Sequence, residues 1–189
     1  MIESIQQQGA AWGLGTYLLL LLLYHGGEYY FAWKHHGNRS VDALLITWPY
    51  VIAQSLCLLE YVLEWHYFPE WKTAYYPAWW LIGLGGCATG LFIRFLAIRT
   101  AHQAFTHQIQ TYKRTEHHLV RHGIYKWSRH PGYFGWLLWA VSVPILLKNP
   151  ISLLLFAVWS WRFFSRRIPV EEAFLLDFFG TDYADYREK

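Results

Sequence analysis

Groups that need water or a ligand lie directly beside apolar segments in the second half of this chain. The stretch HHLVRHGIYKWSRHPGYFGW, residues 117–136, gathers His, Arg and Lys between hydrophobic blocks, and Arg167, Glu171 and Glu172 follow it. Arg, His and Glu near lipid are costly unless they are paired or bound to something. The arrangement therefore predicts chemistry at a membrane surface.

The step Arg129-His130-Pro131 is flanked by Gly123 and Gly132. Pro131 suits the first turn of a helix, where a missing N–H costs nothing. The free N–H groups of such a turn favour an anion, for example the carboxylate of a ligand. No GxGxxG, P-loop or nucleophile elbow is present, so neither a soluble dinucleotide fold nor a serine hydrolase is supported.

A metal site is an alternative interpretation, because six of the ten histidines fall in this basic connection: His102, His107, His117, His118, His122 and His130. Their spacing argues against it. There is no HExxH or paired CxxC, and two adjacent histidines usually point their imidazoles apart. We expect no metal, and a single histidine here is equally well explained as a membrane anchor or a helix cap.

The composition predicts an all-α, polytopic integral membrane protein with a single domain over residues 1–189. Only 15% of the residues are charged, against about 25% in soluble domains. The apolar residues form five blocks, at residues 12–31, 43–63, 78–97, 133–147 and 151–164. The first three reach the length of about 20 residues that a helix needs to cross a membrane. We therefore expect about five transmembrane helices.

Polar residues interrupt the first three blocks, namely His25, Glu28, Glu60 and Arg94, and we expect them to face other helices or the site. The last two blocks are short and are separated only by residues 148–150. This spacing predicts a C-terminal helical hairpin of shallow or tilted helices. Cys57 and Cys87 lie inside different blocks and are expected to be apolar core residues.

Lys and Arg set the expected orientation. They concentrate after the third block and at the end of the fifth, while the connection after the second block holds Glu64, Glu70 and one lysine, Lys72. The polar stretch and the C-terminus should then face the cytoplasm, with the N-terminus on the other side. The net charge of +3 is explained by this topology, and we expect no nucleic acid partner.

The chain resembles isoprenylcysteine carboxyl methyltransferases. The resemblance is carried by His117-His118-Leu119-Val120, Gly123, Tyr125, Arg129-His130-Pro131-Gly132-Tyr133, Gly135-Trp136, Trp161-Arg162-Phe163-Phe164, Arg167, Glu171-Glu172, Phe178-Phe179-Gly180, Tyr183 and Tyr186, with Phe105, His107 and Gln110 upstream. Tyr24, Glu28 and residues 40–45 extend it into the N-terminal half. The resemblance spans most of the chain and is strongest from Phe105 to Tyr186.

The resemblance implies methylation, with S-adenosylmethionine, of the C-terminal carboxylate of S-prenylated cysteine on processed CaaX proteins, in the endoplasmic reticulum membrane. It makes residues 1–98 the N-terminal transmembrane helices and residues 99–189 the catalytic half. It implies a cytoplasm-facing cofactor pocket lined by Gln110, His117, His118, Leu119, Val120, Tyr125, His130, Pro131, Gly132, Tyr133 and Glu171. It places Arg167 on the substrate, with Arg167 and Glu171 as the catalytic pair.

Physical chemistry is consistent with these roles. A carboxylate nucleophile is ionised at neutral pH and needs no general base. Arg167 can orient it through a bidentate fork that lysine does not reproduce. Glu171 would share a helix face with Arg167, four residues earlier, but Pro169 favours a helix start nearby over one uninterrupted helix. A solvated ion pair at a helix end is the alternative for these two residues.

Three other functions stay open at this level: a membrane methyltransferase acting on a phospholipid amine or a small thiol or carboxylate, an NADPH-dependent sterol reductase, and a non-catalytic membrane scaffold. The family pattern commonly continues past the region of Tyr186 with a short apolar segment, whereas this sequence stops at Lys189. We expect a trimmed or a shortened member of the family.

Overall fold

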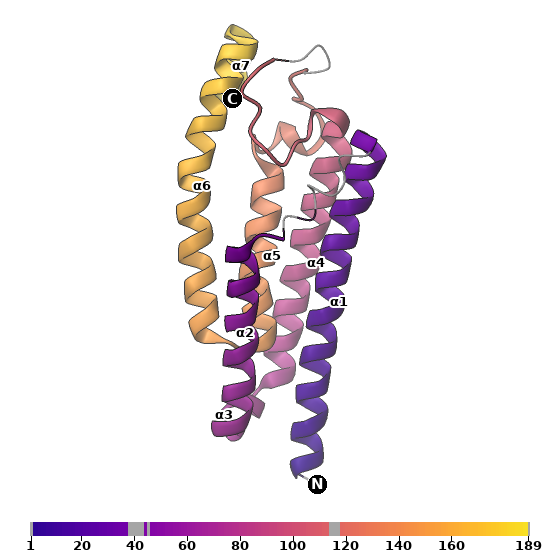
Figure 1. Cartoon of the computed structure of the whole chain (residues 1–189), viewed down its shortest axis with the longest axis vertical. Coiled ribbons are helices and arrows are strands. Elements are labelled where there is room, and N and C mark those ends of the chain that lie inside the picture. Colours follow the sequence, from indigo (N-terminus) through magenta and orange to yellow (C-terminus); the bar gives the residue numbers. More distant parts are fainter. Residues whose placement is uncertain (1, 38–43, 45, 114–117, 189) are drawn as a thin grey trace.

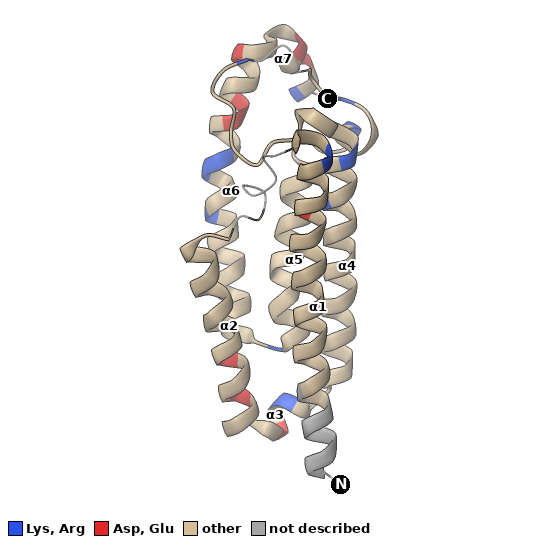
Figure 2. Ribbon diagram, turned by 45° about the vertical axis from the view of Figure 1, so that its right-hand side comes forward, with Lys and Arg blue, Asp and Glu red and all other residues tan. Residues whose placement is uncertain are grey.

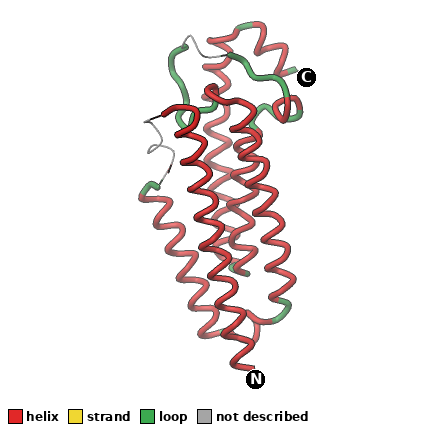
Figure 3. The backbone as a smooth tube through the Cα atoms, turned by 90° about the vertical axis from the view of Figure 1, so that its right-hand side faces the viewer, coloured by secondary structure: helices red, strands yellow, loops and turns green. Residues whose placement is uncertain are grey.

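The described part of the chain is a bundle of long helices joined by turns and loops, with no strand among the described residues (Figures 1 and 3). The computed structural model describes residues 2–37, 44, 46–113 and 118–188. Its helices are α1 (Ile2–His36), α2 (Trp48–Tyr67), α3 (Pro69–Thr73), α4 (Tyr76–Ala101), α5 (Pro131–Leu147), α6 (Pro150–Phe179) and α7 (Thr181–Arg187), with two 3₁₀ turns, η2 (His102–Ala104) and η3 (Gly123–Lys126). The expected all-α class is confirmed.

Glycines bring α4 and α5 into backbone contact. A Cβ atom added at Gly83 would lie 2.2 Å from the Leu146 nitrogen, and one at Gly90 would lie 2.6 Å from the Trp139 nitrogen. These two glycines are seven residues apart, so they lie on one face of α4. Small residues in such a stripe allow helix axes to approach closely, which increases dispersion contact where lipid provides no hydrophobic driving force.

The core lies where α1, α2, α4 and α5 meet. Tyr24 of α1 stacks on Trp139 of α5 with ring centroids 4.4 Å apart. Cys57 and Cys87 are free and fully buried in the same core, which confirms them as small core residues. The polar interruptions also point inward: His25 contacts Tyr50, for example.

The C-terminal hairpin is confirmed, but the expected shortness of its second helix is wrong. Residues 148–149 alone separate α5 from α6, and α6 runs for 30 residues, about 45 Å at 1.5 Å per residue. Pro169 lies inside it. A proline removes one backbone hydrogen bond, and here Ser165, four residues earlier, is exposed. The helix continues past the proline to Phe179.

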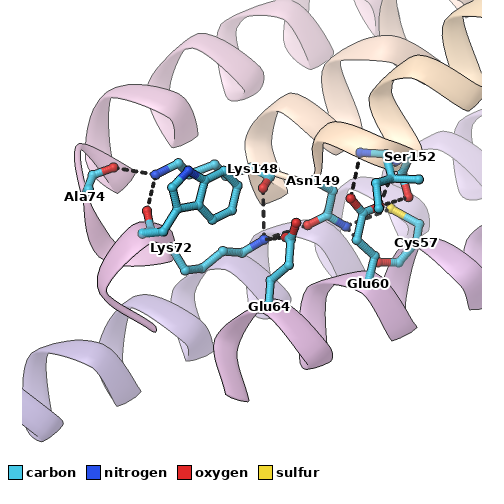
Figure 4. Close-up of polar contacts among 10 residues, drawn as sticks. Cys57, Glu60, Glu64, Lys72, Ala74, Lys148, Asn149 and Ser152 are labelled. Carbon is cyan, nitrogen blue, oxygen red and sulfur yellow. Dashed lines mark hydrogen bonds and ion pairs between the residues drawn. The ribbon is translucent and has the colours of Figure 1, made fainter. Parts of the chain in front are cut away.

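A buried polar cluster joins α2 and α3 to the turn between α5 and α6, at the end of the bundle opposite the C-terminus (Figures 1 and 4). The Lys72 ammonium is fully buried. It donates to Glu64, to the Lys148 carbonyl (3.0 Å) and to Asn149 Oδ1 (2.8 Å), so all three of its protons have acceptors. The Asn149 amide in turn donates to the Cys57 carbonyl (2.7 Å).

Glu60 of α2 caps the first turn of α6 in the same cluster. Its carboxylate accepts the backbone N–H groups of Ile151 and Ser152, both at 2.7 Å. The first N–H groups of a helix have no partner within the helix, and a carboxylate there also meets the positive end of the helix dipole. The cluster therefore fixes where α6 begins.

Charged residues and exposed apolar residues occupy different parts of the bundle along its long axis. Lys, Arg, Asp and Glu gather toward the two ends, and the middle of the bundle is almost free of them (Figure 2). Large apolar side chains point outward there, for example Leu22 of α1 (72% exposed), Leu56 of α2 (52%) and Leu154 of α6 (65%). An apolar exterior around buried polar groups suits lipid and not water.

Within the described residues, one helical stretch, Tyr76–Ala104, is both long and apolar enough to cross a membrane when judged by length and composition alone. α5 is apolar but has 17 residues. α2 begins at Trp48, with Pro49 in its first turn; residue 43, the expected start of the second apolar block, lies outside the described residues. The number of spans stays a prediction.

Candidate active site

Residues 118–130 of the polar stretch form a loop that contains η3, over the end of the bundle where α7 and the C-terminal end of α6 lie (Figure 1). Here the loop, the start of α5, the end of α6 and α7 enclose a cavity of about 120 Å³. It is lined by Ala101, Ala104, Phe105, Thr106, His118, Leu119, Val120, Tyr125, Arg129, His130, Gly132, Tyr133, Glu171, Leu175, Phe179, Tyr183 and Tyr186. One wall is therefore aromatic, and one carboxylate faces the cavity.

A second cavity of about 80 Å³ adjoins the first. Arg167, Gln108, Ile109, Gln110, Phe174 and Phe178 line only this one. Both are lined by Ala104, Thr106, His118, Glu171, Leu175 and Phe179. Because these walls are shared, the two cavities are compartments of one site, with a guanidinium at one compartment and a carboxylate between them.

The uninterrupted α6 supplies this shared wall. Arg167, Glu171, Leu175 and Phe179 follow one another at four-residue steps, so they lie along one face of the helix. The expected break near Pro169 would have separated Arg167 from the other three. The proline is exposed, on the side of the helix away from this stripe.

Tyr133 joins Arg167 to Glu171. Its hydroxyl accepts a hydrogen bond from Arg167 Nε (2.8 Å) and donates one to a Glu171 carboxylate oxygen. Arg167 Nη2 also donates to the backbone carbonyl of His107 (2.6 Å). The guanidinium is thus held at two points, and a cation and an anion that need not touch are fixed relative to each other through one phenol.

Glu172 ties the turn before α5 to α6. Its Oε1 atom accepts from Arg129 Nε (2.9 Å) and from His130 Nε2 (3.1 Å). Burial alone would raise the pKa of this carboxyl, but the His130 hydrogen bond and the Arg129 charge outweigh burial and lower the pKa. Glu172 is therefore ionised at neutral pH. Arg129 also donates to the Arg187 carbonyl (3.0 Å), which holds the end of α7 against the site.

The structure brings most of the expected site residues together. His118, Leu119, Val120, Tyr125, His130, Gly132, Tyr133 and Glu171 line the first compartment. Gln110 and Arg167 line only the second, so Gln110 lies apart from most of the residues expected to share its role. Pro131 is buried and begins α5 as expected, without lining either cavity. His117 lies outside the described residues. Which of these side chains contact a ligand stays a prediction.

Several lining residues were not expected to form the pocket: Thr106, Leu175, Phe179, Tyr183 and Tyr186. Leu175 and Phe179 could have been found from their four-residue steps after Glu171, had α6 been taken as continuous. Tyr183 and Tyr186 belong to α7, and Tyr186 reaches the Tyr125 carbonyl. No local pattern in the sequence indicates that contact.

Within the described ranges, no three side chains of His, Cys, Asp or Glu come together in a way that could hold a metal ion. Two histidines of this region instead lie against carboxylates: His130 contacts Glu172, and His107 contacts Glu28 of α1 (2.6 Å).

The sequence profile of the isoprenylcysteine carboxyl methyltransferase (ICMT) family matches residues 81–177, more than half of the chain. The chain belongs to this family. Its similarity to individual members reaches well beyond that range. A probable protein-S-isoprenylcysteine O-methyltransferase of Oryza sativa subsp. indica is 44% identical over 171 residues, which cover 89% of this chain and 88% of the rice protein. Protein-S-isoprenylcysteine O-methyltransferase A of Arabidopsis thaliana is 44% identical over 179 residues, covering 93% and 89% of the two chains.

A solved structure confirms the fold of this ICMT family member. The eukaryotic intramembrane Ras methyltransferase ICMT, determined without a monobody, superposes with a TM-score of 0.90 at 34% sequence identity. The match covers 95% of this chain and 65% of that one. The likeness therefore includes the N-terminal helices, and this protein shares the fold of an intramembrane methyltransferase.

Proposed function

We propose that this protein transfers a methyl group from S-adenosylmethionine to the α-carboxylate of a C-terminal S-prenylated cysteine. The observation that carries the proposal is the chain Arg167–Tyr133–Glu171 at the boundary of two compartments. It provides a cation for a carboxylate acceptor and an anion for a positively charged donor, at a fixed separation. The names of the relatives support the same reaction.

Arg167 is the acceptor-binding residue in this proposal. Its Nε and Nη2 atoms are occupied by Tyr133 and the His107 carbonyl, while Nη1 has no hydrogen-bond partner among the described residues. A prenylcysteine carboxylate, with an intrinsic pKa of about 3.5, is ionised at neutral pH and can accept from Nη1. The residues have to orient the carboxylate and exclude water; they do not have to remove a proton.

Glu171 and the aromatic wall suit the donor. S-adenosylmethionine, when bound, supplies a methyl group on a positively charged sulfur next to an adenosine. Glu171 and Phe179 line both compartments, and Tyr125 and Tyr186 line the first. Carboxylates and aromatic rings both attract cations, and aromatic rings also stack on bases.

The outer surface explains why the acceptor would be a lipid-modified group. Exposed Leu, Val and Trp side chains cover the middle of the helices, for example Val158 and Trp159 of α6. A prenyl chain partitions into the same environment at roughly 0.8 kcal/mol per buried methylene. The substrate carboxylate is then delivered close to the end of the bundle where Arg167 lies.

We place that end at the cytoplasmic face of the endoplasmic reticulum membrane. Basic residues surround the site, including Arg99, Lys113, Arg121, Lys126, Arg162 and Arg166, and the opposite end carries Glu64, Glu70 and Lys72. An excess of Lys and Arg favours the cytoplasmic side. The donor would enter from the cytosol and the prenyl group from the bilayer.

The test is transfer of labelled methyl from S-adenosylmethionine to N-acetyl-S-farnesylcysteine by the purified chain in detergent. Unprenylated N-acetylcysteine and phosphatidylethanolamine serve as parallel acceptors. We expect label in the farnesylated acid alone. Label in phosphatidylethanolamine with none in the farnesylated acid would assign a different acceptor, and absence of cofactor binding in a folded sample would overturn the proposed reaction.

A further inference from the structure

A buried carboxylate on α1 lies behind the active site. Glu28 has no exposed surface. It accepts hydrogen bonds from Arg94 Nε (2.6 Å) and Nη2 (3.2 Å) on α4, and from His107 Nε2 (2.6 Å) in the loop after η2. A buried charge is tolerated only when it is paired and hydrogen-bonded. Both Glu28 oxygens meet this condition, and neither side chain that satisfies them belongs to α1.

The His107 contact leads directly to the active site. The side chain of His107 is held by Glu28, while its backbone carbonyl accepts from Arg167 Nη2 (2.6 Å). Glu28 and Arg167 are therefore separated by one residue. The segment around His107 belongs to no regular helix or strand, so no helical hydrogen bond fixes the direction of its carbonyl.

The Arg94 contact keeps the carboxylate in place. Arg94 donates hydrogen bonds to Glu28 from Nε and Nη2, and its Nη1 donates one to the Gly132 carbonyl (3.1 Å) in the first turn of α5. Its guanidinium also lies over the Phe105 ring, 4.9 Å from the centroid. With α4 and α5 in backbone contact, this arrangement gives Glu28 a fixed position relative to Tyr133, the next residue after Gly132.

We propose that Glu28 is a positioning residue for the acceptor: acting through His107, it fixes the backbone carbonyl that orients the Arg167 guanidinium toward the substrate carboxylate. The inference rests on the proposed function of Arg167. An arginine side chain has many rotamers, and ordering it costs entropy. Glu28 lowers that cost at binding because the guanidinium is already held at two points, Tyr133 and the His107 carbonyl.

The experiment compares equilibrium binding of N-acetyl-S-farnesylcysteine with binding of its carboxamide, which keeps the prenyl group and lacks the charge. The purified chain should bind the acid more tightly. We expect Glu28→Gln to reduce this preference about tenfold, while binding of the carboxamide is unchanged. Glu60→Gln is the control: it also removes the charge of a hydrogen-bonded helix carboxylate, but one that caps α6 at the far end of the bundle, and it should keep the preference.

A second variant guards against misfolding of Glu28→Gln, which leaves Arg94 with a neutral partner. His107→Ala removes only the link to the loop and leaves the Glu28–Arg94 pair intact, and we expect the same loss of preference. Combined with Arg167→Lys, His107→Ala should add little further loss, because both changes act on one interaction.

Three results would count against this inference. Retention of the acid preference in the folded His107→Ala variant would overturn the role of Glu28 while leaving the role of Arg167 in place. Additive losses in the double variant would do the same. Equal binding of acid and carboxamide by the unmodified chain would overturn the acceptor assignment and this inference with it.

Discussion

The charged side chains of the proposed active site are held by neighbouring protein groups. Arg167 contacts Tyr133 and a backbone carbonyl, and Glu171 contacts the same phenol. Methyl transfer to a carboxylate requires alignment of the reactants and little proton movement, so fixed orientation is the main contribution that such residues can make. The two charges should therefore affect acceptor and donor separately.

Substitution of the two charged residues should divide these roles. We expect Arg167→Lys to lower kcat/KM for N-acetyl-S-farnesylcysteine by about 30-fold, because lysine cannot reproduce the planar fork, with little change in cofactor affinity. Glu171→Ala should weaken cofactor binding by a similar factor. Titration calorimetry with S-adenosylmethionine beside initial rates measures both. Equal losses of both quantities in both variants would contradict the division.

Glu172 should make stability depend on pH. Its pKa is lowered in the folded chain, so its contacts stabilise the fold fully above the ordinary carboxyl pKa of about 4.5, and this contribution is lost as the pH falls through the lowered value. We expect Glu172→Gln to cost about 1 kcal/mol at pH 7, a modest value because Arg129 is partly exposed. The difference in Tm between the two chains should shrink on acidification. A difference that stays constant from pH 7 to well below the ordinary carboxyl pKa of about 4.5 would contradict the assignment.

At the scale of elements, two helices determine how the site is built. α5 is fixed by its backbone contact with α4, and its first turn carries Gly132 and Tyr133 to the cavity. α6 extends beyond the hairpin and presents a stripe of side chains to both compartments. An error in the position of either helix would move Tyr133 relative to Arg167.

The glycine stripe offers a direct test of the α4–α5 contact. A methyl group at Gly83 would lie 2.2 Å from the backbone nitrogen of Leu146, whereas one at Gly85 of the same helix meets no atom within 4 Å. We expect Gly83→Ala to destabilise the chain by about 3 kcal/mol, because backbone cannot move aside as a side chain can. Gly85→Ala should leave Tm unchanged or slightly raised. Similar Tm values for the two variants in thermal unfolding would show that the helices can separate at no cost.

At the scale of the whole molecule, two polar ends enclose an apolar middle (Figure 2). One end carries the proposed active site, and the other carries the Lys72–Asn149 cluster, which joins α3 to the α5–α6 turn (Figure 4). Lys72 and Asn149 hydrogen-bond to each other, to Glu64 and to the backbone carbonyls of Lys148 and Cys57. Among the described residues, none of this cluster lines either compartment.

Loss of the Lys72–Asn149 contacts should lower the stability of the fold without changing the preference for the farnesylated acid. Asn149→Ala removes an acceptor from buried Lys72 and a donor from the Cys57 carbonyl. We expect a destabilisation of about 2–4 kcal/mol and an unchanged preference for the farnesylated acid over its carboxamide, measured below the lowered Tm. Asn149→Asp keeps the acceptor for Lys72 and should lose less. A changed preference in Asn149→Ala would mean that the two ends are coupled.

The sequence by itself determined the helical, membrane-directed class of the protein and the residues that can carry its chemistry. Both follow from local properties: block hydrophobicity, the distribution of Lys and Arg, and side-chain types at short spacing. Eight of the expected residues line the first compartment, and Arg167 and Gln110 line the second. The inward-facing polar residues of the first three blocks could likewise be predicted, since a lone charge on a lipid-facing surface is costly.

Only the tertiary structure decided which of these groups meet. Glu28 lies 66 positions from Arg94 and 79 from His107, and contacts at such separations leave no periodic trace in one sequence. The aromatic wall of α7 was missed for the same reason. At Pro169 the local sequence predicted a helix start, but the structure has a continuous helix. A proline inside a helix loses one hydrogen bond, and this is a small cost beside the contacts that α6 makes along its length.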